Sequence, residues 1–139
     1  ISSFLFEDIV NEKIHITSNN PIIRKKLVSM QRLIGQDNNI VCEGRDIGSV
    51  VFPNADFKFF LVADLKSRIQ RRFNELKLKN PLLDIKDVED SLTSRDYNDS
   101  TRINSPLIKP VESIEIDTTK MTIEMQVNYI YKLIKQEQN

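Results

Sequence analysis

The sequence predicts an α/β fold in which helices cover a parallel β-sheet. Two short segments have the pattern of strands, FKFFLVA at 57–63 and SIEIDTT at 113–119. The first is too uniformly apolar for a strand with one solvated face, and such strands are typical of parallel sheets covered on both faces. Segments of helical periodicity lie between and after the two strands. That alternation indicates layered helices and sheet.

The N-terminal region is expected to form two helices. Residues 4–18 carry apolar side chains at helical spacing. A second helix is expected to begin after Asn20, whose side chain can cap the first turn, and to end at Gly35. We expect an apolar stripe of this second helix to be buried. The stripe consists of Ile23, Leu27, Met30 and Ile34.

A third strand is expected at NIVCEG, residues 39–44, with Cys42 buried in it. Cys42 is the one cysteine of the chain, so an intramolecular disulfide is impossible and a reducing cytoplasm is the default location. One cysteine and one histidine also leave no plausible zinc site.

Three further helices are expected after the strand at 57–63, over 65–79, over 85–98 with Asp84 as its cap, and over 122–136. Each has apolar residues at helical spacing that we expect to face inward. For the three helices in order they are Leu65, Ile69, Phe73 and Leu76; Ile85, Val88 and Leu92; and Val127, Ile130, Tyr131 and Ile134.

The composition is that of an ordinary soluble globular protein, with 139 residues, 40% hydrophobic and 29% charged. The formal net charge is zero, which does not indicate nucleic acid as a partner. No run approaches the roughly 20 apolar residues of a membrane span, and no segment resembles a signal peptide. We therefore expect one domain whose partners are neither nucleic acids nor membranes.

The GRD segment at 44–46 is the first candidate for chemistry, because it directly follows a predicted buried strand. Gly44 lets the backbone turn or approach a ligand closely. Arg45 offers a planar fork of donors suited to phosphate, and Asp46 offers an acceptor for amino or hydroxyl groups. An Arg–Asp pair that only closes a turn explains the same residues equally well.

Arg68, Arg71 and Arg72 form a second candidate on one side of the helix predicted at 65–79, with Glu75 one turn further on. Like charges at this spacing cost an isolated helix about 0.2–0.5 kcal/mol. A bound polyphosphate would replace this repulsion with charge-assisted hydrogen bonds. A solvated basic face is the commoner explanation in general, and both remain open.

The third candidate is RDYNDSTR at 95–102, in which Arg95, Asp99 and Arg102 follow the spacing i, i+4, i+7. If the stretch is helical, these three side chains project from one face. They suit a ligand with hydroxyls and phosphates. Salt bridging along the helix is a sufficient structural explanation too, and exposed pairs of that kind contribute only about 0–1 kcal/mol.

Several longer blocks together resemble the bacterial cytidylate kinases, the CMP/dCMP kinases, in order along nearly the whole chain. The GRDIG-x-VVFP and RD-x-x-D-x-x-R blocks are the most specific. The blocks are NNPIIRKKLVSMQRLI at 19–34, EGRDIGSVVFPNADFKFFLVADLKSRIQRR at 43–72, SLTSRDYNDSTRINSPL at 91–107 and IEIDTTKMTIEMQV at 114–127.

The resemblance implies the P-loop nucleoside monophosphate kinase fold, with three layers and a parallel sheet flanked by helices. It also implies a transferase of pyrimidine nucleotide metabolism, which moves the γ-phosphoryl group of ATP to CMP or dCMP with Mg²⁺ and gives CDP or dCDP. The implied partners are therefore the small nucleotides CMP, dCMP and ATP. The implied location is the cytoplasm, and the intact protein is expected to be a monomer.

The resemblance also assigns roles on the acceptor side, residue by residue. Arg24 and Asp46 match residues that recognise the cytosine ring. Arg45 and Arg102 match residues that hold the CMP phosphate. The residues that match those near the ribose hydroxyls are Arg95 and Asp99.

On the donor side, Arg68, Arg71 and Arg72 match the lid arginines that close over the ATP phosphates. Closing such a lid excludes water from the transferring group. The residues expected to be catalytic are Arg45, Arg68, Arg72 and Arg102.

The family's N-terminal third, with its phosphate loop, is expected to be missing from this chain. The three glycines of this chain, Gly35, Gly44 and Gly48, form no G-x-x-x-x-G-K-[ST] loop. No residue of the chain is assigned to a metal. The chain is then a single partial kinase domain, incomplete at its N-terminus. We expect residues 1–36 to belong to the monophosphate-binding region, 37–64 and 105–139 to the core, and 65–104 to the lid and the following helix.

Such a fragment is expected to be inactive alone and to self-associate through exposed apolar surface. Two other interpretations remain. A naturally short paralogue could bind nucleotides without catalysis, as a regulatory protein. A single-stranded RNA groove is less favoured, since it requires aromatics interleaved with the basic residues.

Overall fold

The computed structural model describes residues 20–137. The helix predicted at 4–18 lies outside these residues. The described chain divides into two compact units. The first unit comprises residues 20–54 and 99–108, and the second comprises 55–98 and 109–137.

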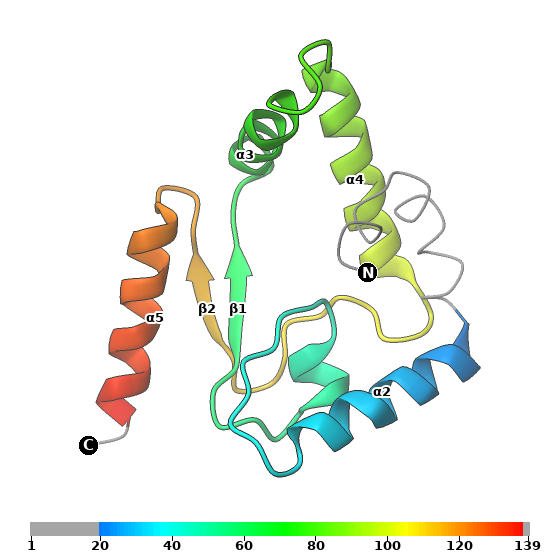
Figure 1. Ribbon diagram of the computed structural model, residues 1–139, viewed down its shortest axis with the longest axis vertical. Helices are drawn as coiled ribbons and strands as arrows, with labels where there is room; N and C mark the ends of the chain where they lie inside the picture. Colours follow the sequence, from blue (N-terminus) through cyan, green and yellow to red (C-terminus); the bar gives the residue numbers. More distant parts are fainter. Residues whose placement is uncertain (1–19, 138–139) are drawn as a thin grey trace. The chain divides into compact units, whose positions relative to one another are not determined.

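The first unit contains α2 (Pro21–Gly35), where the predicted helix and its cap are confirmed. The Oδ1 atom of Asn20 accepts hydrogen bonds from the main-chain N–H groups of Ile22 at 2.9 Å and Ile23 at 3.2 Å. These contacts satisfy two of the donors that a helix N-terminus leaves open. Figure 1 shows α2 as the blue-to-cyan helix.

The predicted burial of the α2 stripe is wrong, because α2 contains no buried residue. The rest of the described chain covers these side chains only in part. Their exposed fractions are 38% for Ile23, 49% for Leu27, 49% for Met30 and 65% for Ile34.

Gly35 is the last residue of α2, but its φ is not positive, so a left-handed cap does not explain why this residue is glycine. A Cβ atom at this position would lie 2.8 Å from Ile40 Cδ1 and 2.8 Å from Phe52 Cε1. Only glycine fits such a close approach without movement of these neighbours.

The strand predicted at 39–44 is also wrong. These residues form no strand, Val41 is fully exposed and Cys42 is exposed. The sheet of the described chain has two strands, and neither of them comes from this segment. A strand requires a neighbour for its backbone hydrogen bonds, so β-propensity alone did not suffice here.

Directly after GRD the chain forms η2 (Ile47–Val51), a single π-helical turn that the sequence did not predict. Its hydrogen bonds span five residues, from Val51 N to Asp46 O at 3.2 Å and from Phe52 N to Ile47 O at 2.7 Å. The turn buries Val51, which is 1% exposed. π-helical turns are rare and are frequent at functional sites.

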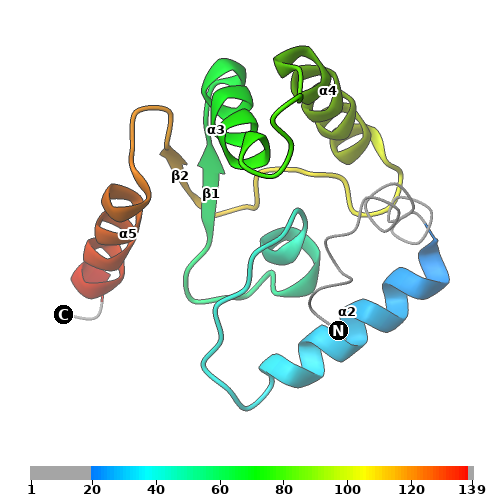
Figure 2. The same cartoon turned by 45° about the horizontal axis from the view of Figure 1, so that its top comes forward.

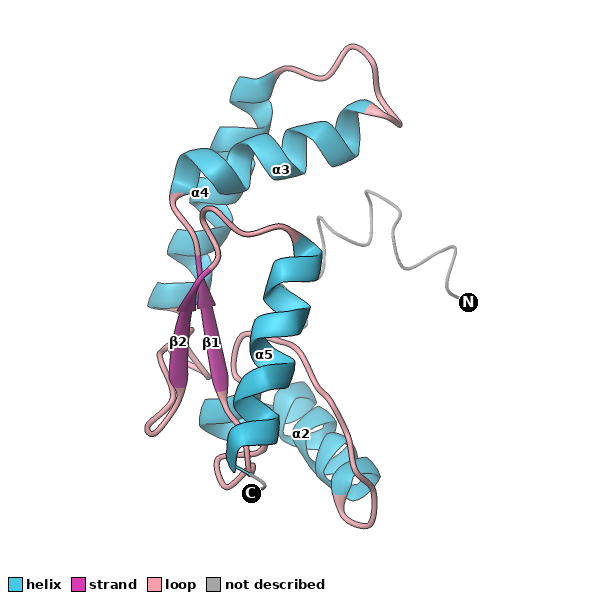
Figure 3. Ribbon diagram, turned by 90° about the vertical axis from the view of Figure 1, so that its left-hand side faces the viewer, coloured by secondary structure: helices cyan, strands magenta, loops and turns pink. Residues whose placement is uncertain are grey.

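The second unit contains β1 (Phe59–Val62) and β2 (Ile114–Asp117), which confirm both predicted strands in shortened form. They pair in parallel from Phe59 opposite Ile114 to Val62 opposite Asp117. Figures 1 and 3 show them side by side. Ile116, at 2% exposed, anchors the sheet in the small core. The predicted α/β class with a parallel sheet is thereby confirmed.

The three later helices are confirmed as α3 (Leu65–Lys77), α4 (Ile85–Thr101) and α5 (Ile123–Glu137). Figure 2 shows α3 beginning just beyond the end of β1, and in Figure 3 α5 runs back along the strands in the opposite direction. Asp84 Oδ1 accepts from Lys86 N at 2.9 Å at the start of α4. None of the described helices is both long enough and apolar enough to cross a membrane.

The predicted inward faces are confirmed only in part. Ile69 and Val88 are buried, at 8% and 3% exposed. Other predicted core residues are exposed, because too little of the described chain covers those faces of the helices. They are Leu65, Ile85, Val127 and Tyr131.

Candidate functional site

Five of the six residues predicted for the acceptor side form one arginine–aspartate network in the first unit. Arg24 lies on α2, Arg45 and Asp46 directly precede η2, and Asp99 lies in the last turn of α4. The network consists of Arg24, Arg45, Asp46, Asp99 and Arg102, together with Ser105. The sixth predicted residue, Arg95, also belongs to α4 and is exposed, and its role stays a prediction.

Asp46 forms an ion pair with Arg24, between its Oδ2 atom and the arginine Nη2. The two side chains are 12% and 15% exposed. The Asp46 carbonyl also accepts from Val50 N at 2.8 Å, so the residue is held at both its backbone and its side chain. The turn-closing alternative would pair Asp46 with adjacent Arg45, but the structure pairs it with a residue 22 positions earlier.

The carboxylate of Asp99 lies between two arginines. Its Oδ2 atom is 3.0 Å from Arg45 Nε, and its Oδ1 atom is 3.5 Å from Arg102 Nη1. The helix α4 ends at Thr101, so Arg102 lies just beyond it rather than on a helical face as the spacing suggested. The predicted salt bridge between Asp99 and Arg102 is present. Asp99 also forms a salt bridge with Arg45 that the sequence did not predict.

Ser105 joins two arginines of the network, and sequence reasoning missed it. Its Oγ atom accepts from Arg24 Nε at 3.2 Å, and its carbonyl oxygen accepts from Arg102 Nε at 2.6 Å. Its φ of 54° is in the left-handed region, which is uncommon for a residue other than glycine. The available signal was a serine before Pro106 inside the RDYNDSTRINSPL block, since serine and proline mark turns.

The charge of the network favours an anion, because three guanidinium groups face two carboxylates. The Arg102 side chain is 10% exposed, and its Nη2 atom is buried without a hydrogen-bond partner among the described residues. A buried donor without a partner costs about 1–3 kcal/mol. An anionic oxygen that reached this nitrogen would remove that cost.

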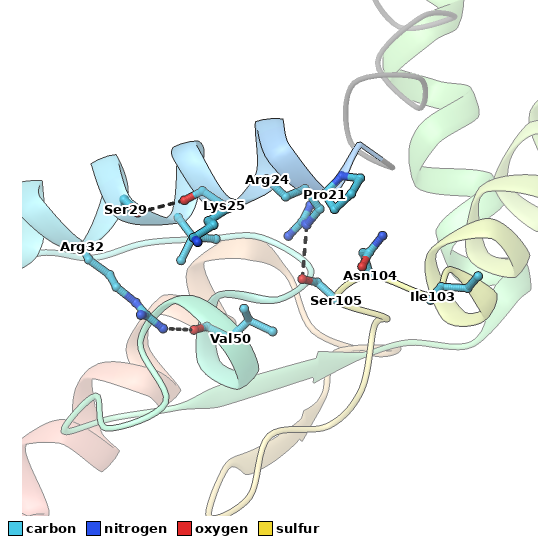
Figure 4. A pocket seen from close by; sticks show the side chains of 10 residues that line it. Pro21, Arg24, Lys25, Ser29, Arg32, Val50, Ile103, Asn104 and Ser105 are labelled. Carbon is cyan, nitrogen blue, oxygen red and sulfur yellow. Dashed lines mark hydrogen bonds between the residues drawn. The ribbon is translucent and has the colours of Figure 1, made fainter.

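An open pocket of 410 Å³ in the same unit shares Arg24 and Ser105 with the network. This size is in the usual range for small-molecule sites. Figure 4 shows Arg24 and Ser105 joined by their hydrogen bond at this pocket. The polar residues that line it are Arg24, Lys25, Ser29, Arg32, Asn104 and Ser105.

In the second unit, Arg71 is bound to main-chain carbonyls at the turn after β2. Its Nη2 atom donates to the carbonyls of Thr118, of Thr119 at 3.3 Å and of Met121 at 3.2 Å, and its Nη1 atom to Thr118 Oγ1 at 3.3 Å. These contacts hold α3 to the segment that leads into α5. Sequence reasoning did not predict this structural contact.

The two neighbouring arginines of α3 have carboxylate partners instead. Arg68 Nη1 lies 2.6 Å from Asp96 Oδ2, and Arg72 Nη1 lies 2.8 Å from Glu75 Oε2. The Nε atom of Arg68 is buried without a hydrogen-bond partner in the described chain. Arg68 and Arg72 therefore keep donors that a phosphate could engage by exchanging with these carboxylates.

Two aspartates near the carboxyl ends of the strands, Asp64 after β1 and Asp117 at the last position of β2, have lowered pKa values. The Ser67 N–H and hydroxyl lower the pKa of Asp64, and the Thr119 hydroxyl and N–H lower that of Asp117. Hydrogen bonds to a carboxylate favour its charged form. Residues 20–137 contain no group of three or more His, Cys, Asp or Glu side chains that could hold a metal ion.

A family model described as cytidylate kinase matches residues 1–136. The chain belongs to the cytidylate kinase family. It is similar to the cytidylate kinase of Fusobacterium nucleatum, with 45% identity over 135 residues that cover 97% of this chain and 62% of the relative. It is also similar to the cytidylate kinases of Chloroherpeton thalassium, with 45% identity over 89% of this chain and 54% of the relative, and of Caldanaerobacter subterraneus, with 42% over 97% and 60%.

This cytidylate kinase chain spans about half to three-fifths of the length of the curated relatives that it matches. The matched portions are the C-terminal parts of those relatives. The predicted resemblance is thereby confirmed at the level of the family.

Proposed function

We propose that this chain belongs to a kinase that transfers the γ-phosphoryl group of ATP to CMP or dCMP and gives CDP or dCDP. The observation that carries the proposal is the buried Nη2 atom of Arg102, which has no hydrogen-bond partner among residues 20–137 and belongs to a network of net positive charge. Membership of the cytidylate kinase family supports a phosphate monoester of a pyrimidine nucleoside as the anion.

On the acceptor side, Arg24 and Asp46 would recognise the cytosine ring. Arg24 lines the open pocket and pairs with Asp46, so the pair combines guanidinium donors with carboxylate acceptors, the groups that can bind the edge of a base. Arg45 and Arg102 would hold the phosphate, and Arg45 is 41% exposed, so its guanidinium can be reached from solvent. Arg95 and Asp99 would contact the ribose hydroxyls.

On the donor side, Arg68 and Arg72 would neutralise charge on the ATP phosphates, because phosphoryl transfer requires mainly positioning and charge stabilisation. Arg71 would support them indirectly, since its donors are used by carbonyls. When bound, Mg²⁺ would supply positive charge that neutralises the phosphates. The described residues contain no group of three or more His, Cys, Asp or Glu side chains that could hold the ion without the nucleotide.

For the whole protein we propose the P-loop nucleoside monophosphate kinase fold. In that fold, residues 1–36 would belong to the monophosphate-binding region and 65–104 to the lid and its following helix. Residues 37–64 and 105–139 would belong to the core. A cytoplasmic monomer that acts on free nucleotides is part of the same proposal.

Calorimetric titration of the chain with CMP tests the acceptor half of the proposal, with UMP as the matched control ligand. Tighter binding of CMP than of UMP supports the site, and equal or absent binding of both contradicts it. A second titration with ATP and Mg²⁺, followed by an assay for CDP, tests the donor half. CMP binding without CDP formation by this chain is the expected result if the chain lacks the phosphate loop, so the CDP assay is repeated with the intact protein. Absence of CDP formation there would support a nucleotide-binding protein without catalysis.

A further inference from the structure

We infer that Ser105 is a positioning residue that orients the two arginines of the network, Arg24 through its hydroxyl and Arg102 through its carbonyl. As far as it concerns a nucleotide, the inference rests on the proposed function. The positioning itself rests on the hydrogen bonds of Ser105.

Ser105 and Asp46 together fix the guanidinium plane of Arg24. Ser105 Oγ accepts from Nε at 3.2 Å, and Asp46 Oδ2 pairs with Nη2. Because a guanidinium is planar, two contacts on different nitrogens set the direction of the remaining donors. Loss of the serine hydroxyl would leave Asp46 as the remaining side-chain acceptor of Arg24 among residues 20–137 and would let the guanidinium plane rotate about that contact.

The same residue fixes Arg102 from its backbone. Its carbonyl accepts from Nε at 2.6 Å, and Asp99 lies 3.5 Å from Nη1. The third nitrogen, Nη2, is buried and has no hydrogen-bond partner in the described part of the chain. Ser105 and Asp99 therefore hold Arg102 so that the N–H donors of Nη2 stay available to an anionic oxygen.

The backbone of Ser105 makes this double contact possible. At a φ of 54° the residue is in the left-handed region, although it is not glycine. Such conformations persist where surrounding contacts impose them, and they cluster at binding sites. The hydrogen bond from Leu107 N to Asp99 O at 2.7 Å holds the segment that follows Ser105.

The two contacts of Ser105 predict unequal effects on the two parts of a nucleotide. The hydroxyl serves Arg24, which is proposed to recognise the base, whereas the carbonyl serves Arg102, which is proposed to hold the phosphate. Removal of the hydroxyl should thus weaken binding of a ligand with a base more than binding of one that has only sugar and phosphate. A residue that merely stabilised the fold would weaken both equally.

The test uses the full chain with Ser105→Gly and Ser105→Ala. Both variants remove the hydroxyl, but glycine adopts the left-handed conformation freely whereas alanine remains strained there. Ser113→Ala is the matched control, because Ser113 Oγ donates to Pro110 O at 2.6 Å and contacts no arginine in the described chain. The ligands are CMP and ribose 5-phosphate, titrated by calorimetry.

We expect both Ser105 variants to bind CMP about tenfold more weakly, the usual effect of a lost hydrogen bond to a charged group. Binding of ribose 5-phosphate should change by less than about threefold, and the control should bind both ligands as the wild type does. Equal losses for both ligands, no loss, or a loss in only one of the two Ser105 variants would overturn the inference.

A measurement without ligand separates this inference from the proposed function. Hydrogen exchange at the arginine Nε–H groups, followed by NMR, should become faster at Arg24 in both Ser105 variants and stay slow at Arg102. Unchanged exchange at Arg24 would overturn the positioning role. If the wild type binds neither ligand, the proposed function fails, and the exchange at Arg24 still decides whether Ser105 positions that arginine.

Discussion

Arg45 Nε lies 3.0 Å from Asp99 Oδ2, although the two residues come from distant segments of the chain. The same carboxylate lies 3.5 Å from Arg102, and the Asp99 side chain is 15% exposed. One carboxylate thus balances two guanidinium groups in a partly buried setting. Removal of its charge leaves both arginines without compensation.

We therefore expect Asp99→Asn to lower the free energy of unfolding by about 1–3 kcal/mol, because charged groups that lose a buried partner are costly. Urea unfolding followed by circular dichroism measures the change. Glu89→Gln, on the exposed side of α4, removes one negative charge from the same helix and should change stability by less than about 0.5 kcal/mol. An unfolding midpoint for Asp99→Asn equal to that of the control would contradict the role of Asp99.

Arg102→Ala should weaken binding of CMP by about 10- to 100-fold, since the phosphate loses a charge-assisted partner contributing about 1.5–3 kcal/mol. Cytidine, which has no phosphate, should bind wild type and variant equally. Both affinities can be measured by calorimetry. Lys66→Ala, which removes an exposed positive charge on α3, serves as the control. If CMP affinity is unchanged in Arg102→Ala, Arg102 does not hold the phosphate.

Local signals in the sequence predicted most of the elements. The Asn20 cap placed the start of α2, because a cap acts on residues directly after it along the chain, and the dense apolar run at 57–63 placed β1, which pairs with the other predicted strand, β2. The failed strand at 39–44 depended on a pairing partner that sequence spacing does not specify. The predicted burial of apolar residues on α2 and α5 is wrong for a similar reason, because burial depends on what covers a helix face.

The candidate site shows the same division. Motifs predicted which arginines and aspartates matter, but not the pairing of Arg24 with Asp46 or of Arg45 with Asp99. Those pairs join segments far apart in sequence, so no spacing rule relates them. Ser105 and the π-helical turn were missed because a left-handed serine and a five-residue hydrogen bond have no strong sequence signal.

Arg71 and Arg72 are neighbours on α3 with different contacts. These contacts predict that removal of the two side chains will lower the free energy of unfolding by different amounts. Arg71→Ala leaves several carbonyls at the turn after β2 without their donor, so the free energy of unfolding should fall by about 1.5–3 kcal/mol. Arg72→Ala breaks one exposed ion pair with Glu75 and should change it by less than about 0.5 kcal/mol. Thermal or urea unfolding compares the two directly, and equal losses would refute the structural role of Arg71.

The stability of the second unit should depend on pH through Asp64. The Ser67 N–H and hydroxyl lower the pKa of this carboxyl, so the folded chain binds its proton less tightly than the unfolded chain does. The resulting stabilisation is present above the unfolded pKa of about 3.9 and is lost as the pH falls through the lower folded value. Asp117, whose pKa is lowered by Thr119, acts in the same direction.

Urea unfolding at a series of pH values from 6 down to about 3 should show this loss. Asp64→Asn keeps an oxygen that can accept from Ser67 N but has no charge to titrate, so its stability should fall less steeply below about pH 4. Gln70→Ala changes an exposed residue of α3 without removing a titratable group and should retain the wild-type slope. If Asp64→Asn and the wild type lose stability in parallel, the cap at the start of α3 is not a source of the acid sensitivity.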